Sequence, residues 1–336
     1  MSEPVTVIVT CFNLVRYIRN AVDSVLAQDY DGSIQLVVVD DCSTDGSLEL
    51  LRGFADVELV QLSRNGGVMN ATLEGLKRAQ YDAVFFLDGD DIWHRSKLSK
   101  CMAMLDKNSA LVTHDLRYVD SNGQAISRPT RMSEILGIAP TKDHEKLIRK
   151  CISQHLDYVW LGSAYGIRRS LARIDEFVAY CRSKAMLNTI YQDWPLAAWI
   201  EFTGSGTMHY VDEVLFDYRI HGSNYSGDSR TREKLIRNLI KSRDTMHFIE
   251  EMAHFLLIDK SVFLPYTEAS LKYDFYLDVV QGSRISIFMT SIRFWRLLKF
   301  NQNGVNLAVR IAFGIILGPE VAHRFVEAIK LIRARQ

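Results

Sequence analysis

The sequence lacks the features that mark several large classes of protein. Its 336 residues carry no net charge, so the chain has no overall basic character, and we expect no nucleic-acid partner. Its five cysteines are scattered and never spaced as CxxC, which argues against a structural zinc site and favours reduced thiols in a cytoplasmic protein.

Segments that would enter or cross a membrane are also missing. The opening stretch MSEPVTVIVTCFN has neither a basic segment nor a long apolar run, so we expect no signal peptide. The best spanning candidate, VNLAVRIAFGIILG at 305–318, contains Arg310 and is shorter than the roughly 20 residues that a span needs. Neither GxGxxG nor GxxxxGK[ST] occurs, which disfavours dinucleotide binding and P-loop ATP binding.

What the chain does contain is a regular alternation of strand-like and helix-like stretches over its first ~115 residues. Apolar runs at 5–10, 34–41, 57–62 and 83–88 alternate with helical spacing at 14–28, around 48–51 and at 67–80. Ser43, Thr44 and Asp45 are candidate N-caps of the second of these helices. The alternation predicts an α/β fold, with a doubly wound, mostly parallel sheet and helices on both faces.

Polar side chains follow several of the predicted strands. They are Asn13, Asp40, Asp41, Asp88 and Asp90. In open α/β sheets, ligands bind at the carboxyl ends of the strands. We therefore expect the functional site at this edge of the sheet.

The sequence Asp88-Gly89-Asp90-Asp91 is the most acidic of these strand ends. Residues i and i+2 of a strand point the same way, so Asp88 and Asp90 are expected to converge, with Gly89 permitting a close approach. Oxygen ligands of this kind suit Mg²⁺ or Mn²⁺ shared with substrate phosphates. The alternative is a solvated turn without function, since Asp and Gly are common turn residues. An EF-hand is excluded, because Ile92 and Trp93 occupy positions that such a loop needs for other residues.

Two further loops lead to the same edge. VVVDDCSTDG at 37–46 is a second acidic strand end, for which a capped helix start is the alternative explanation. Two acidic strand ends in one sheet repel each other, which makes a purely stabilising role hard to explain. LSRNGG at 62–67 adds Asn65 and Gly67, and its glycines can bring backbone N–H groups close to a ligand.

Taken together, the motifs resemble those of the family 2 glycosyltransferases of GT-A fold, over about residues 1–228. The segments that carry the resemblance are TVIVTCFN (6–13), VVVDDCSTDG (37–46), SRNGGVMNATLEGL (63–76), FFLDGDDIW (85–93), YQDWPL (191–196) and YRIHGSNYS (218–226). The resemblance implies transfer of a sugar from a nucleotide sugar, with UDP as the expected nucleotide, to a glycan or lipid-linked acceptor with inversion at the anomeric carbon.

The resemblance also implies roles for individual residues. Asp90 and His221 would approach a divalent ion, Mn²⁺ or Mg²⁺, on the diphosphate, and Asp88 would face the ribose or this ion. Donor-binding residues would be Thr10, Phe12, Asn13, Asp41, Asn65, Gly67 and Asp88.

Asp193 is the candidate general base, since the acceptor hydroxyl must lose a proton opposite the leaving group. On its own this residue would be explained as an N-cap of the helix-like DWPLAAWI, with Pro195 in the first turn. Two positions depart from the family pattern. Met69 stands where many members have Arg, which leaves that donor contact absent or supplied by Arg64, and Gln192 stands where Glu usually precedes the base.

The composition changes after Gly227, which predicts a catalytic domain at 1–228 and a helical, basic region at 229–336. Within the first, about 1–115 would bind the nucleotide sugar and about 116–228 the acceptor. Residues 284–336 carry nine Lys or Arg against Glu320 and Glu327, and an apolar stripe with Phe288 and Trp295. Basic amphipathic helices bind anionic lipid, so we expect peripheral contact with the inner face of the cytoplasmic membrane. The alternative is a helical cap packed on the catalytic domain.

Two other functions fit parts of the sequence. FFLDGDDI superficially offers the DxD of a haloacid-dehalogenase-type phosphohydrolase, although the other acidic pair, Asp40-Asp41, lies upstream instead of downstream. An inactive scaffold that binds nucleotide sugars is the third hypothesis.

Overall fold

The apolar runs of the sequence form the strands of a mixed sheet in a computed structural model, which describes residues 2–128, 148, 162–184, 187–203, 206–222 and 231–281. The chain divides into two compact units, Met1–Ser223 and Asn224–Gln336, each of which is described by itself. The domain limits expected from the sequence, 1–228 and 229–336, remain a prediction.

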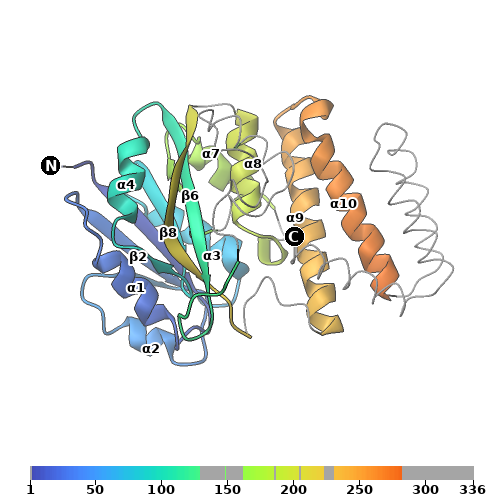
Figure 1. Ribbon diagram of the computed structural model, residues 1–336. Coiled ribbons are helices and arrows are strands. Elements are labelled where there is room, and N and C mark those ends of the chain that lie inside the picture. Colours follow the sequence, from blue (N-terminus) through green and yellow to red (C-terminus); the bar gives the residue numbers. More distant parts are fainter. Residues whose placement is uncertain are drawn as a thin grey trace. The chain divides into compact units, whose positions relative to one another are not determined.

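The described part of the first unit contains eight strands and six α-helices (Figure 1). The strands are β1 (Val5–Cys11), β2 (Ile34–Asp40), β3 (Glu58–Gln61), β4 (Ala83–Asp88), β5 (Ile92–Trp93), β6 (Ser109–Val119), β7 (Gly166–Arg168) and β8 (Thr207–Arg219). The helices are α1 (Ile18–Leu26), α2 (Ser47–Leu51), α3 (Gly67–Arg78), α4 (Lys97–Met104), α7 (Ile174–Arg182) and α8 (Asp193–Thr203), with a 3₁₀ turn at Leu187–Thr189.

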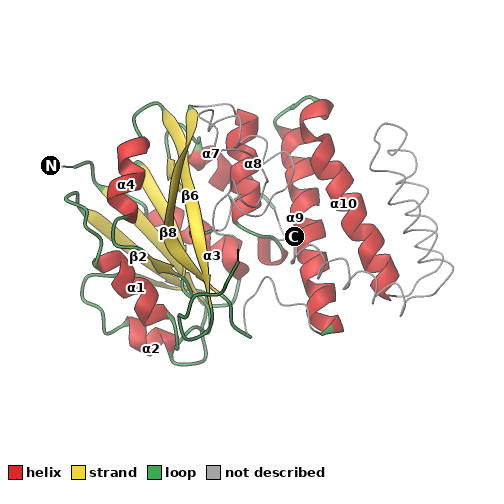
Figure 2. Ribbon diagram, in the orientation of Figure 1, coloured by secondary structure: helices red, strands yellow, loops and turns green. Residues whose placement is uncertain are grey.

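The strand order is β3-β2-β1-β4-β7-β6-β8-β5. The pairs β1–β2, β1–β4 and β2–β3 are parallel, whereas β7 runs antiparallel to both β4 and β6. Figure 2 shows α1, α2 and α4 on one face of the sheet and α3, α7 and α8 on the other. The doubly wound, mostly parallel sheet predicted from the sequence is confirmed. Because the strand order reverses between β1 and β4, the carboxyl ends of these two strands mark the switch point where such folds bind ligands.

Continuous apolar runs became fully covered strands, as expected for parallel strands with helices on both faces. In β1 and β4 the side chains of Val7, Val9, Phe85 and Leu87 are all buried. These strands form a rigid platform, and the polar residues that follow them extend from its edge.

Two local predictions differ from the structure. The helix expected at 14–28 begins only at Ile18, because the Leu14 carbonyl accepts the N–H groups of Tyr17 and Ile18 and closes a separate turn first. The predicted N-caps of α2 were also wrong. Gly46, at φ 92°, occupies the cap position, and Asp45 accepts the Ser47 N–H from one residue further upstream.

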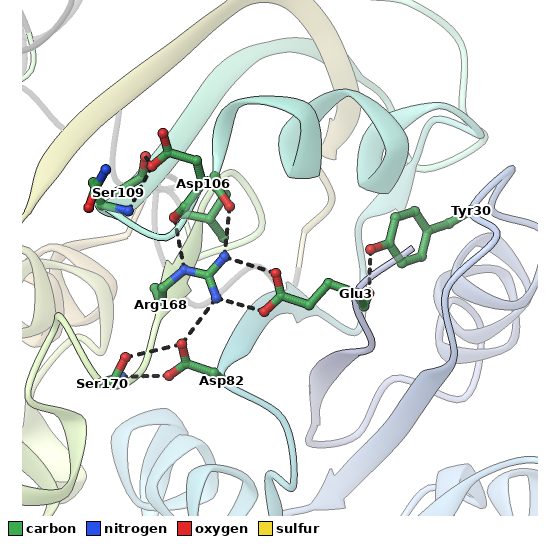
Figure 3. A network of polar contacts seen from close by, with 9 residues as sticks. Glu3, Tyr30, Asp82, Asp106, Ser109, Arg168 and Ser170 are labelled. Carbon is green, nitrogen blue, oxygen red and sulfur yellow. Dashed lines mark hydrogen bonds and ion pairs between the residues drawn. The ribbon is translucent and has the colours of Figure 1, made fainter. Parts of the chain in front are cut away.

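The edge of the sheet opposite the switch point holds an ion cluster around Arg168 (Figure 3). The guanidinium group lies 2.7 Å from a Glu3 carboxylate oxygen and 3.1 Å from an Asp82 carboxylate oxygen. It also donates to the carbonyl oxygens of Leu105 and Asp106, both at 2.9 Å. This one buried cation ties together the segments that precede β1, β4 and β6.

In the second unit, α9 (Arg232–Phe255) and α10 (Lys260–Gln281) pack through Leu235, Leu239, Leu277 and Val280. Both helices lie within the region 229–336 that the sequence predicts to be helical. Among the described residues, no helix is both long and apolar enough to span a bilayer. The basic region at 284–336 lies outside the described residues.

Candidate functional site

The carboxyl ends of β1 and β4 lie side by side. Thr10 pairs with Asp88 in the strand register, and the Thr10 hydroxyl donates to Asp88 Oδ1 at 3.3 Å. The next residue, Gly89, packs so closely that a Cβ atom there would lie 2.7 Å from the Thr10 carbonyl oxygen and 2.7 Å from the Ile18 side chain. A glycine is therefore required where the acidic turn leaves the sheet.

The acidic turn is not a continuation of the strand. β4 ends at Asp88, and the Asp91 N–H donates to the Asp88 carbonyl at 3.0 Å, which reverses the chain at once. The expectation that Asp88 and Asp90 converge as residues i and i+2 of a strand had the wrong geometry. The turn, and not the strand pleat, decides how these two carboxylates are presented.

The Asp91 side chain is buried and hydrogen-bonds to other segments of the protein. Its carboxylate accepts from the Ser163 hydroxyl at 2.6 Å and from the Arg219 N–H at 2.9 Å. Burial, reinforced by the nearby charges of Asp90 and Asp88, raises the pKa of Asp91 well above its usual value. Asp91 therefore anchors the turn to β8 and to the residues before β7.

His221 reaches the acidic turn from the end of β8. Its Nε2 lies 3.0 Å from Asp90 Oδ2, and its ring stacks on Tyr17 with the two ring centroids 4.6 Å apart. The Arg219 guanidinium donates to the Asp90 carbonyl at 2.8 Å. Asp90 and His221, which are 131 positions apart in the sequence, are thus brought together, as expected from the two motifs that contain them.

Asp41 lies at the end of β2 and faces the Gly66-Gly67 loop. Its two carboxylate oxygens accept the N–H groups of Gly66 at 2.7 Å and Gly67 at 2.8 Å. Burial raises the pKa of Asp41 despite these hydrogen bonds. Gly67 has φ 82°, and a Cβ atom there would lie 2.9 Å from Asn188 Cα, so both conformation and space require glycine. Asn65 Oδ1 also accepts the Gly67 N–H, at 3.2 Å.

Phe12 and Asn13 form the rim between β1 and β2. The Phe12 side chain is 42% exposed. Asn13 has φ 55°, and its side-chain oxygen accepts the Thr44 N–H at 2.8 Å, which joins the loops that follow the two strands. Asn13 tolerates the left-handed conformation better than most residues do. The Phe12 ring therefore adjoins Asn13, whose position is fixed by its hydrogen bond with Thr44.

Asp193 is the first residue of α8, and its carboxylate accepts the Trp194 N–H at 3.0 Å. The preceding residue, Gln192, donates from its side-chain amide to Asp88 Oδ1 at 3.0 Å. Burial raises the pKa of Tyr165 well above its usual value, and the carboxylates of Asp193 and Asp88 raise it further. The start of α8 therefore lies at the acidic edge of the sheet.

The side chains suit a divalent ion that is shared with a substrate better than an ion held by protein alone. Among the residues that the structure describes, no group of three His, Cys, Asp or Glu side chains is placed to hold a metal. Asp90 and His221 nevertheless offer an oxygen and a nitrogen at one point, with Asp88 two residues from Asp90. Mg²⁺ is commonly bound by one or two carboxylates plus substrate phosphates, and this donor set fits that arrangement.

Sequence reasoning assigned no structural role to three residues that build the site. Tyr17 supports His221, Ser163 accepts the Asp88 N–H at 3.0 Å and binds Asp91, and Gln192 contacts Asp88. Gln192 stood inside a recognised motif and so carried a signal. Tyr17 and Ser163 carried none, because their roles arise from contacts between distant segments.

Comparison with known proteins gives a consistent result. The profile described as glycosyl transferase family 2 matches residues 6–174. TuaG of Bacillus subtilis strain 168, a glycosyltransferase provisionally named for teichuronic acid biosynthesis, is 25% identical over 254 residues, which cover 73% of this chain and 90% of TuaG. An uncharacterised glycosyltransferase of Rickettsia prowazekii strain Madrid E is 23% identical over 92% of this chain and 94% of its own length.

The poly(ribitol-phosphate) beta-N-acetylglucosaminyltransferase TarS of Staphylococcus aureus strain Mu50 is 33% identical over 108 residues, which are 31% of this chain and 19% of TarS. The crystal structure of S. aureus TarS 1–349 superposes with a TM-score of 0.56 at 17% identity, covering 98% of this chain and 92% of that one. Its complex with UDP-GlcNAc gives a TM-score of 0.54 at 16% identity, with the same coverage.

Proposed function

The chain belongs to glycosyl transferase family 2 and has a GT-A fold, and we propose that it is an inverting enzyme that moves a sugar from a UDP-sugar to a hydroxyl of a glycan or lipid-linked acceptor. The observation that carries the proposal is the meeting of Asp88, Asp90, His221 and the start of α8 at the switch point of the sheet. The UDP-GlcNAc complex of the similar TarS structure supports the choice of UDP.

Family membership argues against both alternatives raised from the sequence, a phosphohydrolase and an inactive scaffold that binds nucleotide sugars. A phosphohydrolase would need a lysine beside Asp88, whereas the buried Lys97 binds His114 Nε2 at 2.7 Å and the Ser163 carbonyl at 2.6 Å. An inactive scaffold has no support from the glycosyltransferase relatives. Both alternatives are therefore set aside in favour of sugar transfer.

In the proposed donor site, Asp41 and the loop that it holds receive the nucleotide base and ribose. Thr10, Phe12 and Asn13 form the strand-end side of this site, and Asn65 and Gly67 form the loop side. Asp41 already fixes the Gly66 and Gly67 N–H groups, so the loop is ordered before a ligand arrives. Ordering that is already present lowers the entropic cost of binding.

Asp90 and His221, together with Asp88, would hold Mn²⁺ or Mg²⁺ at the diphosphate. When bound, such an ion acts as a Lewis acid that stabilises the charge on the departing nucleoside diphosphate. Tyr17 keeps the His221 ring in place by stacking, and Arg219 holds the backbone of Asp90. The positions of both proposed ligands are therefore set before the donor binds.

Asp193 is the proposed general base. Its carboxylate would accept the proton of the acceptor hydroxyl while that oxygen attacks the anomeric carbon from the face opposite the nucleoside diphosphate. One displacement of this kind inverts the anomeric centre. A positioned base of this type contributes about 10²- to 10⁴-fold to the rate.

The basic region 284–336 remains a proposed surface for anionic membrane, which would place the enzyme at the inner face of the cytoplasmic membrane. Its nine basic residues against two acidic ones support this proposal. Flotation of the intact protein with vesicles that contain anionic lipid, at low salt, is the expected result. Absence of binding there would contradict the proposal.

A panel of nucleotide sugars tests the proposed reaction. We expect UDP and a UDP-sugar to raise the melting temperature, more strongly with Mn²⁺ present, and release of UDP to require an acceptor saccharide. Asp193→Asn should lower kcat about 10²- to 10⁴-fold with little effect on UDP binding. Asp175→Asn, in the first turn of α7, is the matched control and should leave kcat unchanged. Stabilisation by no nucleoside diphosphate at all would exclude the proposal.

A further inference from the structure

Gln192 lies where the donor side and the acceptor side of the site meet. It is buried, and its amide nitrogen donates to Asp88 Oδ1 at 3.0 Å across 104 positions of sequence. At its other end, the side-chain oxygen accepts from the Thr72 hydroxyl of α3. A carboxylate only accepts hydrogen bonds, so the NH₂ group must face Asp88 and the carbonyl must face Thr72. Both ends of the amide are thereby fixed.

The space around this contact is closed. A Cβ atom on Gly162 would lie 2.4 Å from Gln192 Nε2 and 3.1 Å from Asp88 Oδ2. Any side chain at position 162 would therefore push the amide away from the carboxylate. Glycine at position 162 therefore leaves the space that the Gln192–Asp88 hydrogen bond occupies.

The charge of the site explains why an amide suits this position. The same edge already carries the carboxylates of Asp40, Asp41, Asp88, Asp90 and Asp91. Where Glu usually stands in the family pattern, an ionised carboxylate could not donate a hydrogen bond to Asp88, whereas the Gln192 amide does so at 3.0 Å. Glutamine has nearly the same shape as glutamate, but its side-chain NH₂ group can donate a hydrogen bond to Asp88.

We propose that Gln192 is a positioning residue that orients the Asp88 carboxylate toward the nucleotide by a charge-neutral hydrogen bond. The inference rests on the proposed function, because Asp88 is assigned there to the ribose or the diphosphate-bound ion. Gln192 also directly precedes Asp193, so the same hydrogen bond ties the start of α8 to the donor side. Loss of the amide should therefore weaken nucleotide binding, and not only the stability of the fold.

The chain offers a matched control in Gln35. Its amide nitrogen donates to Glu58 Oε2 at 2.9 Å, and its oxygen accepts from the Thr6 hydroxyl at 2.8 Å. Gln35 is half-buried and makes a corresponding pair of contacts at the start of β2, at the opposite end of the strand from Asp40. It also donates to the Arg78 carbonyl oxygen at 3.0 Å and accepts from the Gln80 N–H at 2.8 Å. Substitutions at the two glutamines perturb similar hydrogen bonds, and only one of them is near the proposed site.

The experiment is calorimetric titration of UDP into the full-length protein in the presence of excess Mg²⁺. Gln192→Met should weaken UDP binding about tenfold or more, since a hydrogen bond to a charged group is lost. Gln192→Glu, which gives the residue usual in the family but removes the donor to Asp88, should also bind UDP more weakly than the wild type, and Gly162→Ala should weaken binding in the same direction. Gln35→Met and Gln35→Glu should bind UDP as the wild type does.

A double-mutant cycle separates positioning from a structural role. In an Asp88→Asn background, Gln192→Met should weaken UDP binding by less than about twofold further, because its target is already altered. Equal effects of Gln192→Met in both backgrounds, or wild-type affinity in either Gln192 variant, would overturn the inference. If the wild-type protein binds UDP and the Gln192 variants bind equally well, only this inference fails. If the wild type binds no nucleoside diphosphate, the proposed function itself fails.

Discussion

Carboxylates gather at both edges of the sheet in the first unit, and the two edges neutralise them in different ways. At the edge where β1 and β4 begin, the buried Arg168 binds Glu3 and Asp82 and also caps two carbonyl groups. At the edge where these strands end, Asp88 accepts from the neutral donors Thr10 and Gln192.

The pKa values of three carboxylates differ between the two edges, although at the second edge the pKa of Asp45 is lowered, against the effect of burial, by hydrogen bonds from Ser47 and Val15. Hydrogen bonds from the Ser109 hydroxyl and the Asn108 N–H lower the pKa of Asp106 beside Arg168. Burial raises the pKa of both Asp41 and Asp91 at the other edge. Hydrogen bonds at the first edge favour the charged form of Asp106, whereas burial at the second edge disfavours the charged forms of Asp41 and Asp91, a cost that a bound cation could relieve. Perturbed carboxylates in one place are a recognised sign of function.

The largest expected effect is on the fold. Arg168→Met should lower the free energy of unfolding by about 2–4 kcal/mol, because the two carboxylates lose their cation and two carbonyl groups lose a donor. This loss is smaller than for a fully buried ion pair, because the Glu3 and Asp82 side chains remain 40% and 37% exposed and can be hydrated. Urea denaturation measures the loss. UDP affinity below the unfolding transition should stay unchanged, and a parallel loss of affinity would abolish the contrast between the edges.

Asp90→Asn should lower activity without lowering stability, the reverse of what is expected for Arg168→Met. Transfer activity should fall about 10²- to 10³-fold, the usual cost of removing a group that stabilises developing charge. The free energy of unfolding should stay within about 0.5 kcal/mol of the wild type or rise, because repulsion with Asp91 is relieved. Initial rates and urea denaturation together check this prediction. A variant that retains full activity would remove Asp90 from the proposed site.

Asp91→Asn should change how stability depends on pH. The pKa of Asp91 is raised in the folded state, so the folded protein retains this proton longer than the unfolded chain does. The stability contributed by the protonated group is therefore complete below about pH 4 and is lost as pH rises toward the folded-state pKa. Relative to Asp91→Asn, the wild type should become less stable between pH 5 and pH 8, as measured by urea denaturation at both values.

Asp106→Asn at the other edge should show the opposite sign. The pKa of Asp106 is lowered in the folded state, so its contribution is complete above about pH 4 and is lost at lower pH. The variant should be less stable than the wild type at pH 7, and the difference should shrink in acid. The same pH trend at both edges would contradict the comparison.

The smallest effect is expected for Arg169→Met, one residue from Arg168. Arg169 pairs with Asp175, whose side chain is 80% exposed, so this ion pair is largely hydrated, and Arg169 also donates to the Ala79 carbonyl oxygen at 2.6 Å. A loss of about 1–2 kcal/mol is expected from the surface pair and this hydrogen bond together. Thermal unfolding of the two arginine variants side by side would show whether burial, and not charge alone, gives Arg168 its importance.

Periodicity and the placement of polar residues were sufficient to predict the sheet and the edge at which the proposed site lies. The strands β1, β2 and β4 were expected within one residue of their observed ends, because continuous apolar runs followed by Asp or Asn mark them clearly. The helix starts were less accurate. The turn at Leu14 and the left-handed Gly46 depend on hydrogen bonds that no period reveals.

The features of the candidate site likewise divide into those that the sequence predicts and those that depend on tertiary contacts. The sequence by itself determined which residue types stand at the strand ends and, through the motifs, that Asp90 and His221 belong together. Only the tertiary structure decided that Asp91 turns inward to Ser163 and Arg219, that Tyr17 supports His221, and that Gln192 binds Asp88. The physical reason is the range of the contacts. A period of two or 3.6 residues fixes what lies within one element, whereas these partners are 72 to 204 positions apart and meet only when the sheet is complete.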